Sequence, residues 1–163
     1  TYTDITQGLV HSKDDILYLP YDNRIAKNDN GVWTLIALQL PASMYITSIC
    51  EMGNNIAIAM APLSGAVAGQ SRVYIWDRDT SVTTLSETIP WEEGQLQILE
   101  VVDGYLVGIS ISGNSTTRHN NRIIFRFLDG KMGEKFILRY SISGPPHLVQ
   151  TAAEMMSSFK WLD

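Results

Sequence analysis

The sequence lacks most of the features that mark small secreted domains, membrane proteins and nucleic-acid binders. Among its 163 residues Cys50 is the only cysteine, so no disulfide can form within the chain. No stretch approaches the roughly 20 apolar residues that a membrane-spanning helix needs. The 12 lysines and arginines are scattered and are outnumbered by 17 acidic residues, which gives a net charge of −5. We therefore expect no membrane span and no nucleic-acid partner.

The composition predicts a globular chain instead. Hydrophobic residues make up 45% and charged residues 18% of the sequence, and the length is sufficient for one domain with a substantial core. Cys50 lies among apolar residues and is expected to be a buried, unreactive thiol. No signal peptide is recognisable, and the start at Thr1 suggests a trimmed chain or a fragment of a longer one.

Motifs for catalysis and cofactor binding are also missing. His11, His119 and His147 are far apart and lack the spacing of metal ligands. The sequence around Ser110 begins like a nucleophile elbow, but it lacks the second glycine and continues as a predicted strand. There is no Walker loop and no dinucleotide-binding fingerprint. We expect no catalytic residues, no metal and no cofactor, and we interpret the chain as a non-enzyme.

An internal repeat is the most informative feature that is present. Three arginines, each at the start of an apolar run, are spaced by 48 and 50 residues: Arg24, Arg72 and Arg122. A turn signal follows each run: Asn30-Gly31, Asp79-Thr80 and Asp129-Gly130. Asn-Gly and Asp-Gly pairs supply the positive φ angles of a tight hairpin, and another β-prone run follows each turn. The pattern predicts a hairpin at the same place in each unit.

The repeat continues upstream of the second and third arginines. Residues 56–61 read Ile-Ala-Ile-Ala-Met-Ala and residues 107–112 read Val-Gly-Ile-Ser-Ile-Ser, so that large and small residues match at every position. Alternation with a period of two is typical of strands. Small residues along one face allow a neighbouring sheet to approach closely.

Each unit therefore reads as four antiparallel strands, which is the composition of a β-propeller blade. We predict an all-β chain of about three four-stranded antiparallel propeller-like blades, at residues 5–41, 42–92 and 93–144. Residues 145–163 do not repeat and form a tail or the start of a further blade. In the second unit the strands are expected near residues 45–51, 56–61, 72–77 and 82–89. Three blades do not close a ring, so the chain is expected to be part of a larger or multi-chain propeller; a β-sandwich or barrel is the alternative.

Several segments resemble known propeller families. Residues 73–77 are similar to the Trp-Asp strand ending of WD repeats, and residues 29–33 look like a shortened Asp-box of sialidase-type propellers. We interpret both tryptophans, Trp76 and Trp33, as packed aromatic residues. The region 42–144 resembles propeller segments of tail-associated bacteriophage virion proteins. The runs that carry this resemblance are 71–77, 88–91, 103–110 and 121–126. It implies a structural or host-contact role in a particle, with no catalytic residues to carry over.

The favoured function is a non-enzymatic structural or binding module, a component of a phage tail or similar viral particle that mediates protein–protein or host contact. Its expected partners are other protein chains of an assembly or a host surface receptor, its expected location is the virion, and it is expected to be oligomeric. A fragment of a glycan-acting propeller hydrolase and a cellular protein-interaction propeller are the alternatives. A convergent set of acid, base and substrate-holding groups would favour the hydrolase.

Loop lengths predict where a partner binds. Tight turns are expected at one end of the blades, and the longer connections 62–71, 90–94 and 113–121 at the other. Binding residues concentrate on loops that a rigid scaffold holds. The expected binding residues on this loop face are Trp91, Glu92, Glu93, Arg118 and His119. Trp91 also fits a second interpretation, as a plug between two blades.

Overall fold

Residues 7–63, 70–89, 95–103, 105–113, 119–128 and 131–141 are described by a computed structural model of the chain. These residues form twelve β-strands and no helix, which confirms the all-β prediction. The strands make three sheets of four antiparallel strands, and in each sheet neighbouring strands follow one another along the chain. Residues 145–163, where a tail or a further blade is predicted, lie outside the described residues.

The first sheet consists of β1 (Leu9–Val10), β2 (Leu17–Tyr21), β3 (Arg24–Asp29) and β4 (Val32–Gln39). The second consists of β5 (Met44–Met52), β6 (Asn55–Pro62), β7 (Ser71–Asp77) and β8 (Thr83–Ile89). The third consists of β9 (Gln95–Val102), β10 (Tyr105–Gly113), β11 (His119–Leu128) and β12 (Lys131–Ser141). Every strand of the second sheet begins and ends within one residue of its predicted position.

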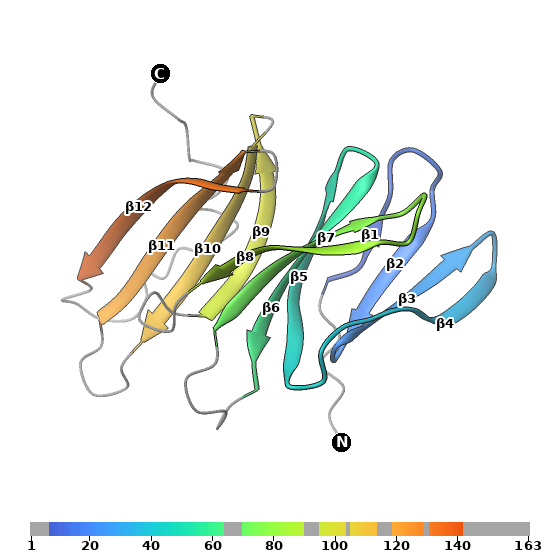
Figure 1. Cartoon of the computed structure of the whole chain (residues 1–163), viewed down its shortest axis with the longest axis horizontal. Coiled ribbons are helices and arrows are strands. Elements are labelled where there is room, and N and C mark those ends of the chain that lie inside the picture. Colours follow the sequence, from blue (N-terminus) through green and yellow to red (C-terminus); the bar gives the residue numbers. More distant parts are fainter. Residues whose placement is uncertain are drawn as a thin grey trace.

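The three sheets lie in a row, with the second sheet between the other two, and the row does not close on itself (Figure 1). The arginine repeat has the same register in all three. Arg24 lies opposite Tyr21, Arg72 opposite Met60, and Arg122 opposite Ile111, each time across the second and third strands of the sheet. The sequence repeat therefore corresponds to a repeat in strand pairing.

Turn chemistry explains where the hairpins form. Between β3 and β4, Asn30 and Gly31 adopt φ angles of 48° and 87°, which an Asn-Gly pair tolerates well. The turn between β7 and β8 is longer than predicted. There the Asp77 carboxylate accepts hydrogen bonds from the backbone N–H groups of Asp79 and Thr80, at 2.9 and 3.2 Å, and so holds a wider loop.

The first sheet departs from the division into a tight-turn end and a loop end that is predicted from the second and third units. Its β2–β3 turn has only two residues, Asp22 and Asn23, whereas residues 11–16 join β1 to β2. The longer connection closes on itself, because the N–H of His11 donates to the Ile16 carbonyl at 3.0 Å. This connection also contacts the second sheet, because the N–H of Ser12 donates to the Glu51 carboxylate. A two-residue hairpin would be too short to make this contact.

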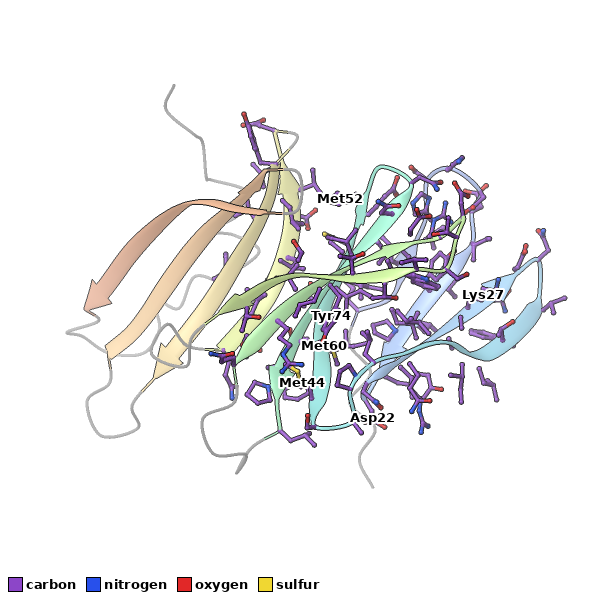
Figure 2. The ribbon with its side chains drawn as sticks, viewed as in Figure 1. Asp22, Lys27, Met44, Met52, Met60 and Tyr74 are labelled. Atoms are coloured by element: carbon purple, nitrogen blue, oxygen red, sulfur yellow. The ribbon has the colours of Figure 1, made fainter. Side chains whose placement is uncertain are left out.

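Large apolar side chains fill the layer between the first and second sheets. Tyr18 and Ile25 of the first sheet pack against a cluster from the second that includes Ile56, Ile58, Met44, Met60 and Tyr74. Figure 2 shows Met44, Met60 and Tyr74 in this region. Trp76 is 4% exposed and meets Tyr18 edge to face, with ring centres 5.6 Å apart, which confirms that it is packed. Trp33 is 48% exposed, so its prediction as a packed aromatic is wrong.

Small side chains allow the third sheet to lie close to the second. Ala57 and Ala59 are fully buried against Leu96 and Leu99 of β9. Because the edge of β9 has no strand partner there, side chains of the second sheet satisfy its backbone. Thr47 donates its hydroxyl to the Leu96 carbonyl at 2.8 Å, and the Ser48 and Ser71 hydroxyls accept from the Leu99 and Leu96 N–H groups at 3.1 and 2.9 Å.

Candidate functional site

The residues predicted for partner binding remain a prediction. Trp91, Glu92, Glu93 and Arg118 lie outside the described residues. His119 is the first residue of β11, where its backbone pairs with Ser141 of β12. Within the described part of the chain, polar groups and exposed apolar residues gather elsewhere, at the contact between the first two sheets.

Arg78 joins these two sheets at the end where the β5–β6 and β7–β8 hairpins turn. Its guanidinium pairs with the Asp14 carboxylate at 2.7 Å, and it donates to the Tyr18 hydroxyl at 3.0 Å and the Asn54 carbonyl at 2.8 Å. It also lies 5.7 Å from the centre of the Tyr18 ring. The side chain of Arg78 is 6% exposed and that of Asp14 is 37% exposed. One buried cation therefore holds residues of both sheets.

These contacts stabilise the charged forms. Burial tends to lower the pKa of Arg78, but the hydrogen bonds to Tyr18 and Asp14 outweigh burial and raise it. Burial also tends to raise the pKa of Asp14, but the hydrogen bonds from Arg78 and the Ile16 backbone together lower it. Nearby, the Ser12 hydroxyl and N–H donate to the Glu51 carboxylate and lower its pKa. The connection between β1 and β2 is thus fixed to the second sheet.

A groove lies between the first two sheets, along β4 and the turn after β7. It has a volume of about 240 Å³. Both sheets line it, with the side chains Tyr18, Lys27, Thr34, Ile36, Ala37, Trp76, Arg78 and Ser81. Lys27, labelled in Figure 2, lies opposite Thr34 in the β3–β4 ladder, so both point to the same side of the sheet. We call this site the inter-sheet groove.

Two residues that line the inter-sheet groove, Trp76 and Lys27, carry a hydrogen-bond donor without a partner among the described residues. The indole Nε1 of Trp76 is buried and donates to no acceptor. The Lys27 ammonium makes neither an ion pair nor a hydrogen bond with the described part of the chain. Buried donors in folded proteins are nearly always paired, so the Trp76 Nε1 calls for an explanation, whereas the half-buried Lys27 is not among the buried unpaired groups.

The edge strand β4 is apolar and uncovered in the described structure. Val32, Trp33, Leu35 and Ile36 are 69%, 48%, 69% and 52% exposed. Residues 30–50 contain no charged side chain. The corresponding edges of the other sheets carry charges: Glu87 in β8, and Lys131, Glu134, Lys135 and Arg139 in β12. Charges on edge strands are a common protection against pairing with other chains, and β4 lacks them.

A second hollow, of about 530 Å³, lies where the first strands of the three sheets approach one another. β1, β5 and β9 line it, with Cys50 and the carboxylates of Glu51 and Glu100 among its residues. Burial, with a smaller effect from Glu100, raises the pKa of Cys50 to about 12, so its thiol stays protonated at neutral pH. This confirms the prediction of a buried thiol.

No group of three or more His, Cys, Asp or Glu side chains within the described ranges is placed to hold a metal ion. No helix in those ranges is long and apolar enough to cross a membrane.

Comparison with protein-family models, curated proteins and solved structures finds no match to this chain.

The inter-sheet groove and the β4 surface were not predicted from the sequence. The run of residues 30–50 without a charge was a detectable signal for β4, because exposed edge strands normally include one. No sequence signal identifies the groove, since Lys27 and Trp76 are brought together only by the packing of two sheets.

Proposed function

We propose that this chain is a non-enzymatic structural and binding module that contacts other protein chains through the uncovered β4 edge. The observation that carries the proposal is the exposure of Val32, Trp33, Leu35 and Ile36 on an edge strand without charge. Contiguous exposed apolar surface marks interaction sites in soluble proteins. Strand edges also offer unpaired backbone groups to an incoming strand.

We further propose that the three sheets are blades of a propeller. Four strands in chain order, repeated three times with the same arginine register, support this assignment. The first strands β1, β5 and β9 line a common hollow, as the inner strands of blades do around a central channel. Because three blades are too few for a ring, the sheets would be part of a larger propeller or of one completed by other copies or other chains.

The narrower proposal is a component of a phage tail or similar particle, located in the virion, with host contact as one role. It rests on the sequence resemblance of residues 42–144 alone. Capsid and tail genes beside the coding gene would support it, and a neighbourhood of cellular genes would contradict it. The proposal that the chain is not an enzyme would be contradicted if the pure protein turns over glycans or esters and one point substitution abolishes that turnover.

Self-association of the purified chain tests the role of β4. Sedimentation velocity between about 1 and 100 μM should show association that Leu35→Lys abolishes, because the substitution places a charge on the apolar edge. Leu63→Lys is the matched control, since Leu63 is another exposed leucine (49%, against 69% for Leu35) but lies after β6. A chain that remains monomeric throughout, or equal association of both variants, would contradict the proposal.

A further inference from the structure

The inter-sheet groove carries a positive charge that no acidic side chain of the described residues neutralises. Arg78 is neutralised by Asp14, but the Lys27 ammonium has no acidic partner in the described structure. The buried Nε1 of Trp76 also lacks an acceptor among the described residues. Thr34 and Ser81 also line the groove, and each hydroxyl can donate a hydrogen bond or accept one. Such a set is suited to an acceptor that carries negative charge.

The size of the groove restricts what can bind. Its volume of about 240 Å³ lies below the roughly 300–1,000 Å³ of typical small-molecule sites, so it suits one side chain better than a whole cofactor. Ile36 is an apolar residue of its wall. Leu85 lies directly opposite Tyr74, so it is on the face of the second sheet that meets the first. These two side chains are 52% and 47% exposed.

We propose that the inter-sheet groove binds the carboxylate of an aspartate or glutamate side chain of a partner polypeptide, whose neighbouring apolar residues contact Ile36 and Leu85. The carboxylate pairs with the Lys27 ammonium, and the Trp76 indole also lines the groove. This inference rests on the proposed function and deepens it by naming the chemistry of the partner. A partner that meets β4 is in position to use the groove, because Thr34, Ile36 and Ala37 of β4 form one of its walls.

The test uses the indole N–H resonance of Trp76 in nitrogen–proton NMR spectra, assigned with Trp76→Phe. The probes are acetyl-Leu-Glu-Leu-amide and the neutral acetyl-Leu-Gln-Leu-amide. We expect the acidic peptide to shift the Trp76 resonance and to bind about tenfold more tightly than the neutral one. Equal binding of both peptides, or no shift up to millimolar concentration, would overturn the proposal. The two peptides are compared on the wild-type protein, and Trp76→Phe serves only to assign the resonance.

Two variants and one further anion complete the test. Lys27→Met keeps the aliphatic stem and should weaken binding of the acidic peptide about tenfold, whereas Lys13→Met, which removes the same charge outside the groove, should change it less than twofold. Equal effects of the two variants would show only a general charge effect and would overturn the assignment. Inorganic phosphate that binds as tightly as the peptide would also overturn it in favour of a free-anion site. Leu35→Lys leaves every residue of the groove unchanged, so failure of the β4 proposal and failure of this one are measured separately.

Discussion

Replacing Arg78 by methionine tests whether the first two sheets depend on one buried cation. The change removes the guanidinium but keeps most of the aliphatic stem that packs near Tyr18. We expect the free energy of unfolding to fall by about 2–3 kcal/mol. The loss arises from three kinds of contact, namely the Asp14 pair, the Tyr18 hydroxyl and the Asn54 carbonyl.

The three contacts do not contribute equally. Asp14 is 37% exposed and recovers water when Arg78 is lost, so its pair is expected to contribute below about 1 kcal/mol. Tyr18 is 3% exposed and Asn54 is partly buried, so their oxygens lose a donor that water replaces poorly, at about 1 kcal/mol each. Most of the loss in the free energy of unfolding should therefore persist when Arg78→Met is combined with Asp14→Asn.

Urea unfolding of the wild type, Arg78→Met, Asp14→Asn and the double variant measures this directly. The coupling energy between positions 78 and 14 should stay below about 1 kcal/mol. Lys13→Met is the control, because Lys13 makes one exposed hydrogen bond to Asn54, and it should change stability by less than about 0.5 kcal/mol. A loss below about 1 kcal/mol for Arg78→Met would refute the reasoning, and so would a coupling energy that accounts for the whole effect.

Three further predictions concern pH, packing and reactivity. The folded-state pKa of Glu51 lies below its ordinary value of 4.5, so its contribution to stability is complete above that pH and is lost as pH falls through the folded pKa. Ser12→Ala should therefore reduce the difference between the urea stabilities at about pH 6 and about pH 3. An unchanged difference would contradict this. Ala59→Leu should destabilise the fold by about 1–3 kcal/mol because no space exists against β9, whereas Ala42→Leu at an exposed position should have little effect in the same urea assay. Cys50 should react with a disulfide reagent at mildly alkaline pH only in denaturant, and rapid reaction of the folded protein would show that the thiol is accessible.

Local signals account for the part of the fold that was predictable. The strands of the second sheet follow the alternation in residues 56–61, and the β3–β4 hairpin follows Asn30-Gly31. Both are decided within a few residues of the chain, by side-chain alternation and by permitted φ angles. The long connection at residues 11–16 was not predictable in this way, because its conformation depends on contacts with Glu51 of another sheet.

The tryptophans show where local patterns stop. Trp76 and Trp33 each lie within a motif that predicted a packed side chain, yet only Trp76 is buried. The difference is their position in the sheets. Trp76 lies in β7, the third strand, and faces Tyr18, whereas Trp33 lies in the edge strand β4, where no further described sheet covers it. Burial of an aromatic residue in a repeat thus depends on a neighbouring sheet, which the motif itself does not specify.

The same comparison identifies a face of the first sheet that the described chain leaves partly open. In the second sheet Ile56, Ile58 and Met60 are fully buried by the first sheet. Counted from the shared arginine register, their counterparts in β2 are Leu17, Leu19 and Tyr21. These three alternate with Tyr18, which faces the second sheet, so they point to the opposite side, and they are only partly buried. If the sheets are equivalent blades, that side requires another sheet, and the apolar β4 edge lies beside it. A structure of the assembly in which this side faces solvent would exclude the blade interpretation.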